Sequence, residues 1–215
     1  MDFSPTELLL KLIIAGIPLV LALTLPYAAQ AWMARRLGDH APAYQGRLSL
    51  NPVVHADLWG SVIIPLFLLL LNSPFLIGWG KPISVNPRLF ANPRRDIALY
   101  ELTQPAALFV MAAIFTLLFR FTSGVETNGL NLLPALAQQG VMVCVAFCAF
   151  NLLPLPPYAG GRVLQMLLPP HLAYQFSKIE PYSFYIFIAL AITGLLWYVL
   201  IPVIQLELAI LSILK

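Results

Sequence analysis

Few side chains in this sequence have the types and spacing that metal or acid–base chemistry requires. The chain contains three histidines, at positions 40, 55 and 171. His55 and Asp57 are two positions apart and His40 lies in a separate loop segment, a spacing that does not preset the tetrahedral geometry of a zinc site. No serine or cysteine is paired with a histidine in an ordered nucleophile motif. These residues therefore predict no catalytic or metal site, and they favour a structural role for His55 and Asp57 in bracing a loop.

The two cysteines, Cys144 and Cys148, are four residues apart in an apolar run. This spacing puts both thiols on one face of a helix. Neither a metal-binding Cys-x-x-Cys motif nor the even set of cysteines of a secreted disulfide framework is present. We expect two small buried side chains.

A proline-rich segment interrupts the apolar run that contains the cysteines. Its candidate substrate- or partner-binding residues are Asn151, Pro154, Pro156, Pro157, Gly160 and Gly161. Because prolines so close together cannot continue an α-helix, we expect an extended chain here, with backbone groups that face protein or water. Asn151 either pairs with the backbone of an extended partner or caps its own helix. The two glycines are expected to allow a tight turn into a helix beginning near Arg162.

The composition indicates where these residues must be held. Of the 215 residues, 60% are hydrophobic and only 10% are charged, with a net charge of +3. Soluble domains carry about a quarter charged residues, so a water-soluble globule is excluded. The small basic excess lies between apolar runs, as expected for loops beside anionic lipid. The partners we expect therefore include lipid and no nucleic acid.

Five windows free of Asp, Glu, Lys and Arg are long enough to hold membrane-spanning helices: 12–34, 58–80, 102–119, 127–161 and 181–206. A span requires about 20 apolar residues. The predicted fold is an all-α integral membrane protein of about five to six hydrophobic helices, with short re-entrant or β-like segments. We expect one polytopic domain over residues 1–215, with a C-terminal helical region at 181–215. With no charge inside a window, no ion path is predicted.

Two windows raise questions of path. Pro18 and Pro26 are expected to kink the first helix or end it locally. The second window breaks at 72–74 and has basic residues on both sides, so it either crosses the membrane or is re-entrant, and the orientation stays open. The alternating segments 47–50 and 81–87 suit short strands.

Three ordered segments carry a family resemblance. The first comprises ARRLGD at 34–39, GRLSLNP at 46–52 and HAD at 55–57. The second comprises IGWGKP at 77–82, VNP at 85–87 and NPRRD at 92–96, and the third FNLLPLPP at 150–157 with GGRVL at 160–164. In this order and spacing the chain resembles the small bacterial branch of the site-2 protease family, the intramembrane zinc metalloproteases. The resemblance covers a core of about residues 25–164.

The resemblance implies a zinc ion held by the two histidines of an H-E-x-x-H helix and by an aspartate of the proline-rich segment. It places the histidines at positions 26 and 30, the catalytic glutamate at 27 and the aspartate at 159. In such a site the metal lowers the pKa of bound water and the glutamate takes its proton. This chain instead has Pro26, Tyr27, Gln30 and Ala159. It also departs from the family at 103–108, which reads TQPAAL.

The loss of all three ligands and the base together predicts a catalytically inactive member of the family. We expect no catalytic residue and no zinc, and a membrane protein, such as an accessory subunit, assembly factor or regulator, whose partners are other integral membrane proteins. The location expected is a bacterial cytoplasmic membrane. Two alternatives stay open: an active metalloendopeptidase with unconventional metal ligands, and transport or ligand binding in a pocket lined by Tyr27, Gln30 and Gln104.

Overall fold

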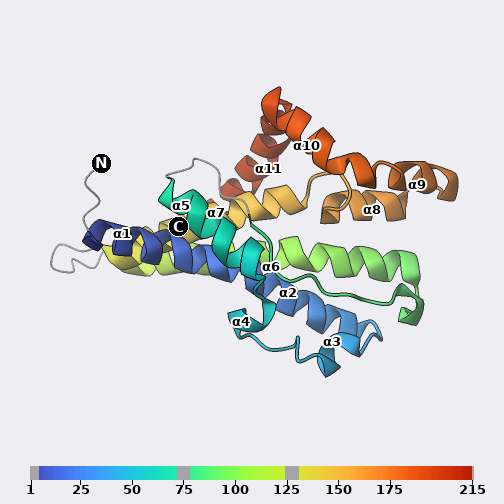
Figure 1. Ribbon diagram of the computed structural model, residues 1–215, viewed down its shortest axis with the longest axis horizontal. Helices are drawn as coiled ribbons and strands as arrows, with labels where there is room; N and C mark the ends of the chain where they lie inside the picture. The colour runs from blue at the N-terminus through green and yellow to red at the C-terminus, as the bar shows by residue number, and fades with distance from the viewer. Residues whose placement is uncertain (1–4, 72–77, 124–130, 215) are drawn as a thin grey trace.

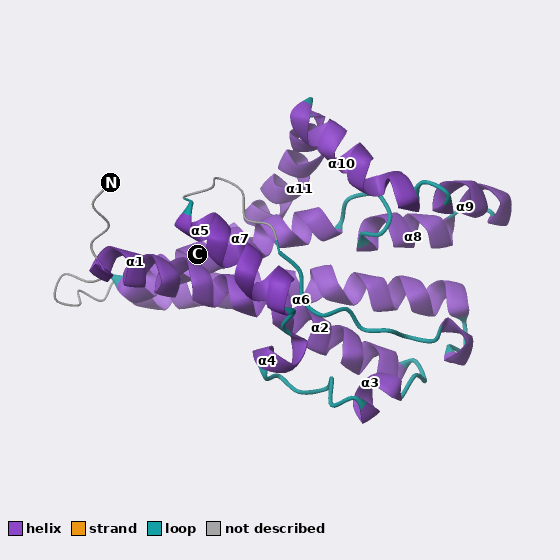
Figure 2. Cartoon of the chain, in the orientation of Figure 1, coloured by secondary structure: helices purple, strands orange, loops and turns teal. Residues whose placement is uncertain are grey.

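The computed structural model describes residues 5–71, 78–123 and 131–214, and within these ranges the chain is helical and has no strand (Figures 1 and 2). The predicted all-α class is confirmed. The elements are α1 (Pro5–Lys11), η1 (Leu12–Gly16), α2 (Ile17–Arg36), α3 (Ala41–Tyr44), α4 (Pro52–His55), η2 (Leu58–Ile63), α5 (Ile64–Leu70), η3 (Pro87–Leu89), α6 (Pro93–Thr122), α7 (Leu132–Asn151), α8 (Ala159–Leu167), α9 (Pro170–Ser177), η4 (Glu180–Tyr182), α10 (Ser183–Ile192) and α11 (Leu195–Ser212).

Four helices in the described ranges are long and apolar enough to cross a membrane: Leu9–Arg36, Pro93–Thr122, Leu132–Asn151 and Leu195–Ser212. The first, third and fourth sequence windows each supply one. The fifth window is not a single helix, because Gly194 adopts a left-handed conformation with φ 76° and separates α10 from α11. Without a Cβ, glycine takes this conformation at little cost, so the chain turns there.

The core of the bundle lies where α6 packs against α7 and α2, with α11 closing against α7 (Figure 1). Gly140 of α7 approaches α6 so closely that a Cβ on it would lie 2.5 Å from the ring of Phe115. Cys144 and Cys148 are buried in this core and form no disulfide, as their spacing predicted. The helices α3 and α4 flank α2, whereas α8 packs on α6 and carries α9 beside it.

Neither proline of the first window ends its helix. Pro26 lies inside α2, which continues to Arg36, and Pro18 occupies the first turn of α2. The residues before Pro18 form the π-helical turn η1, and a second π-helical turn, η2, precedes Pro65 of α5. A proline has no N–H for the preceding turn, and a wider turn accommodates that loss without breaking the helix.

The second window is a hairpin rather than a single crossing. The Trp79 N–H donates to Gly60 O over 3.1 Å, and the Lys81 N–H donates to His55 O over 2.7 Å. The two ends of the window therefore lie side by side, and its apolar helix, Leu58–Leu70, is shorter than a span. The break expected at 72–74 lies outside the described residues.

The strands expected on either side of this window do not form. Residues 47 and 48 are in a turn. Residues 78–86 are extended but pair with no ladder in the part of the chain that the structure describes. Alternation favours a strand only where a neighbouring strand can take the backbone hydrogen bonds, and here the partners are helix ends and loops.

Candidate functional site

The face of α2 that the family resemblance singles out points into the protein. Pro26 and Gln30 are buried, and Tyr27 is partly buried beside them. The phenol of Tyr27 lies within hydrogen-bonding reach of the Gln104 side chain of α6 and of the Gly80 backbone. Helix α2 is thus joined through Tyr27 to α6 and to the extended segment 78–86.

Gly80 allows this segment to lie directly on α2. A Cβ at Gly80 would lie 2.2 Å from Leu23 O and 2.5 Å from the ring of Tyr27. Real Cβ atoms do not approach that closely, so only glycine fits. The segment therefore covers the aromatic ring and restricts access to this part of α2.

The extended segment is held in place by two buried charged side chains. Arg47, only 5% exposed, donates to Val54 O over 2.5 Å, to Pro82 O over 3.3 Å and to the carbonyl of Lys81. Burial lowers the pKa of Arg47 from its ordinary value, although the guanidinium keeps its charge in proteins.

Asp39 is the second buried charged side chain that holds the extended segment. This carboxylate is fully buried and accepts from the Ala41 N–H over 2.9 Å and from the Asn86 N–H over 2.7 Å. A carboxylate buried in this way is stabilised by charge-assisted bonds to backbone donors. The sequence assigned no role to Asp39 or Arg47, because the backbone groups of the extended segment that they hold lie 34 to 47 positions later in the chain.

His55 and Asp57 both contact backbone. The Nε2 atom of His55 lies 2.7 Å from Ser49 O, and Nδ1 is buried without a partner. Burial lowers the pKa of His55, which favours the neutral imidazole. Asp57 caps η2 by accepting from the N–H groups of Trp59 and Gly60. These contacts stabilise the loop before α5.

The other two histidines, His40 and His171, are exposed, on the loop before α3 and on α9 respectively. Within the described ranges, no three His, Cys, Asp or Glu side chains lie close enough together to hold a metal ion. The structure thus does not gather His40, His55 and Asp57 into a ligand set.

The proline-rich segment coils back on itself. The Leu155 N–H donates to Leu153 O and the Tyr158 N–H to Leu155 O, so these donors are used within the segment. The Asn151 amide donates to Phe147 O over 2.8 Å, one turn back in its own helix. Pro154 and Pro157 are exposed, and Pro156 is buried. The extended backbone expected here is therefore replaced by turns.

The helix after this segment begins at Ala159, not near Arg162 as expected. Gly160 and Gly161 lie in its first turn. A Cβ at Gly160 would lie 2.2 Å from Leu152 O, and one at Gly161 would lie 2.3 Å from Leu155 C. The glycines thus serve close packing of α8 on the proline-rich turn, with Ala159 buried beside them.

A buried carboxyl lies inside a candidate span but just outside the charge-free windows. Glu207 lies within α11, one residue beyond the fifth window, and is 5% exposed with no hydrogen-bond partner for either oxygen. The Cys148 side chain is beside it, but that thiol donates over 3.2 Å to Pro105 O of α6. Helix α11 continues beyond the edge of the charge-free window at residue 206, because the first charged residue ends the window but not the helix.

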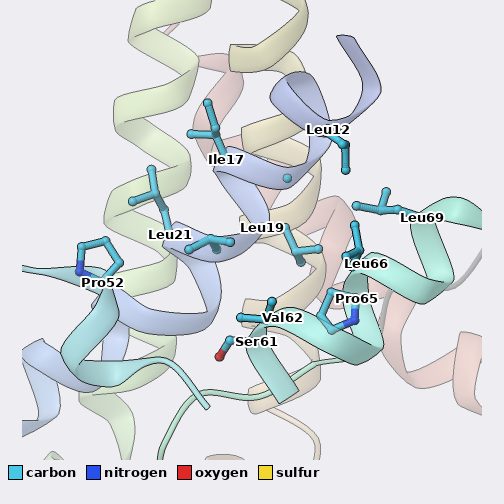
Figure 3. A pocket seen from close by; sticks show the side chains of 12 residues that line it. Leu12, Ile17, Leu19, Leu21, Pro52, Ser61, Val62, Pro65, Leu66 and Leu69 are labelled. Carbon is cyan, nitrogen blue, oxygen red and sulfur yellow. The ribbon is translucent and has the colours of Figure 1, made fainter. Parts of the chain in front are cut away.

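A pocket of about 460 Å³ between η1, α2, η2 and α5 does not contain the family positions. Figure 3 shows aliphatic side chains of η1 and α2 on one side and of η2 and α5 on the other. Its polar residue, Ser61, already donates to Trp79 O over 2.8 Å. Neither this pocket nor a second one of about 420 Å³ along α2 is lined by Tyr27, Gln30 or Gln104.

Comparison with known proteins decides the family. The chain is 32% identical over 210 residues to a Bacillus subtilis (strain 168) protein named "Putative zinc metalloprotease YwhC", and the match covers 94% of this chain and 90% of that protein. The chain belongs to the site-2 protease family. No protein-family model matches it, and no solved structure matches it.

The side chains at the positions that the resemblance assigns to metal chemistry in a site-2 protease do not fit a zinc ion. Pro26 and Ala159 have no side-chain donor atom. The phenol of Tyr27 is engaged by Gln104 and the Gly80 backbone, and a lone Gln30 amide is a weak neutral ligand. The helices α2 and α8 that carry these positions both pack on α6.

Proposed function

We propose that this chain is a catalytically inactive member of the site-2 protease family that binds no zinc and acts through other integral membrane proteins, as an accessory subunit, assembly factor or regulator. The observation that carries the proposal is the set of residues at the four family positions: Pro26, Tyr27, Gln30 and Ala159. Hydrolysis by this family needs a metal that lowers the pKa of water and a base that takes its proton. This set supplies neither.

The packing around Tyr27 supports the same conclusion. The ring of Tyr27 lies under Gly80, and its phenol is engaged by Gln104. A neutral phenol is a poor base at neutral pH. Together with the hydrogen bonds of Asp39 and Arg47 to the backbone, these contacts pack α2, α6 and the extended segment closely together.

The candidate surface for a partner is the proline-rich turn. The backbone donors of Leu155 and Tyr158 are used internally, so a partner would not be bound there by strand addition. The rings of Pro154 and Pro157 remain exposed in the turn between α7 and α8. Rigid, exposed, apolar rings next to a span suit contact with a helix of another membrane protein. The membrane we propose is the bacterial cytoplasmic membrane.

The zinc content of the purified protein tests the inactive-member proposal. The chain and its Bacillus subtilis relative should be expressed in zinc-supplemented medium, purified in the same detergent and measured by elemental mass spectrometry. We expect a substoichiometric zinc content that does not rise when zinc is added back. One tightly held zinc per chain, with chelator-sensitive cleavage of a membrane-embedded substrate in proteoliposomes, would instead establish an active enzyme with unconventional ligands.

Site-specific photocrosslinking tests the partner proposal. A photoreactive residue should be placed in cells at position 154 or 157, and at position 110 as the control, because Val110 is exposed but belongs to α6 rather than to the proline-rich turn. We expect a discrete adduct with one membrane protein from 154 or 157 and none from 110. Absence of any adduct at 154 and 157, or the same adducts at 110, would contradict a partner at this surface.

A further inference from the structure

An open pocket of about 420 Å³ runs along the outside of α2 toward its C-terminal end. Its walls are apolar side chains of α2 and two residues brought in from elsewhere, Leu50 and Thr103 of α6. On α2 these side chains include Leu25, Ala29, Trp32 and Met33. The indole N–H of Trp32 donates to Leu48 O over 2.7 Å, which leaves its apolar ring as pocket wall. The Thr103 hydroxyl donates to Leu99 O, so it too is satisfied.

One residue of this pocket is charged. Arg36 lines it in the last turn of α2 and is exposed. With a rise of about 1.5 Å per residue, the Arg36 position lies roughly 10 Å along the axis from Ala29. The pocket is therefore apolar along its length and cationic at one end, where the span ends.

Arg36 is the pocket member of a larger group of cations at this end of the bundle. The C-terminus of α2 and the N-terminus of α6 lie at the same end in Figure 1. Among described residues, none of the group forms an ion pair within 4.0 Å, and every member is exposed. The group consists of Arg35, Arg36, Arg88, Arg94 and Arg95.

The nearby acids do not neutralise these cations. Asp39 is buried and accepts from the backbone of Ala41 and Asn86. Asp96, in the first turn of α6, is buried and accepts from the Asn92 N–H over 2.8 Å. The cations are thus left for a ligand outside the protein. An apolar channel at membrane depth that ends at such a cation matches a molecule with an acyl chain and an anionic headgroup.

We infer that this pocket binds an anionic phospholipid, with an acyl chain along Leu25, Ala29 and Trp32 and the phosphate at Arg36. An acidic protein segment fits less well, because the wall below Arg36 is apolar and belongs to a span. The cation-rich end then faces the cytoplasm, where anionic lipid and the excess of lysine and arginine are found. The hairpin of α5 is consistent with this orientation, because it keeps the basic residues on both of its sides at one end.

Quenching of Trp32 fluorescence by brominated lipid tests the site. The protein should be placed in phosphatidylcholine nanodiscs containing an increasing fraction of either phosphatidylglycerol or phosphatidylcholine with brominated acyl chains. Subtracting the signal of the matching Trp32→Phe protein isolates Trp32 from the other three tryptophans. We expect brominated phosphatidylglycerol to quench Trp32 at a lower fraction than brominated phosphatidylcholine.

Variants separate a bound lipid from a general surface potential. Arg36→Gln should lower the preference for phosphatidylglycerol about five-fold, as expected for the loss of one cation near an anionic headgroup. Arg36→Lys should retain most of it. Arg88→Gln is the matched control, because Arg88 is exposed at the same end but does not line the pocket. Ala29→Phe should reduce quenching by both lipids by filling the acyl path.

Each variant should keep the helical circular dichroism and the elution volume of the parent protein, so that a folding defect is recognised. Equal quenching by the two brominated lipids with Arg36 intact would overturn the inference. A loss of preference in Arg88→Gln as large as in Arg36→Gln would overturn it as well, because the effect would then belong to the charged surface as a whole. Loss of preference in Arg36→Gln alone, with rescue by lysine, would support it.

Discussion

Replacing Gly160 with alanine should destabilise the protein, although alanine is the better helix former. Gly160 lies in the first turn of α8, where an added Cβ would be 2.2 Å from Leu152 O, 2.5 Å from Leu152 C and 2.7 Å from Leu153 O. All three atoms belong to the backbone of the proline-rich turn, so no side chain can rotate away. An ordinary contact would require α8 to move by about 1 Å, and such overpacking costs about 1–3 kcal/mol.

The net effect follows from two opposing terms. Glycine to alanine inside a helix gains about 1 kcal/mol through the unfolded state. With rigid backbone on the opposing side we take overpacking near the upper end of its range, at about 3 kcal/mol. Gly160→Ala should therefore lower the free energy of unfolding by about 2 kcal/mol, which is about 4–8 °C in melting temperature for a chain of this size.

Gly16→Ala is the matched control. Gly16 is also helical, and a Cβ added to it meets nothing within 4 Å. It should raise stability by up to about 1 kcal/mol, opposite in sign to Gly160→Ala. Both are measured by thermal unfolding in one detergent, followed by circular dichroism. If Gly160→Ala melts at or above the parent temperature, or if both variants shift in the same direction, the close packing of α8 on the proline-rich turn is refuted.

Two further predictions concern buried titratable groups. Because burial lowers the pKa of His55 below its ordinary value near 6.5, the unfolded chain binds the proton more readily, so stability should be level above about pH 6.5 and fall below it. Denaturant titrations at several pH values check this, and His55→Gln should remove its part of the fall; an unchanged pH profile would contradict the assignment. Glu207→Leu should raise stability by about 1–3 kcal/mol, since it removes a buried carboxyl without partners, whereas Glu207→Gln should gain less. A leucine variant less stable than the parent in the same assay would show that the carboxyl has a partner.

The spans were predictable because their signal is local. A helix that crosses a bilayer needs about 20 apolar residues in succession, and the sequence contains such runs at the first, third and fourth windows. The burial of Cys144 and Cys148 followed from the same local pattern. The ends of helices were less accessible, as Glu207 illustrates: charge defined the edge of the window, whereas helix α11 continues through it to Ser212.

The candidate site was predictable only as a set of residue types. The sequence identified Pro26, Tyr27, Gln30 and Ala159 through the family resemblance. It did not reveal that Gly80 lies on Tyr27, or that Gln104 approaches its phenol. The wrong expectation of strands at 81–87 has the same origin, since the hydrogen-bond partners of that segment include His55, Arg47 and Asp39, which lie 26 to 47 positions earlier in the chain.

The sequence by itself determined that this is an all-helical membrane protein and which side chains stand at the family positions, because hydrophobic runs and residue types are properties of short stretches. Only the tertiary structure decided that the second apolar window is a hairpin, that two glycines serve close packing rather than turns, and that Arg36 ends an apolar pocket. The physical reason is that each of these depends on backbone and side-chain contacts between segments distant in the chain. Local propensity does not encode such contacts, and in a bilayer the backbone must find them within the protein.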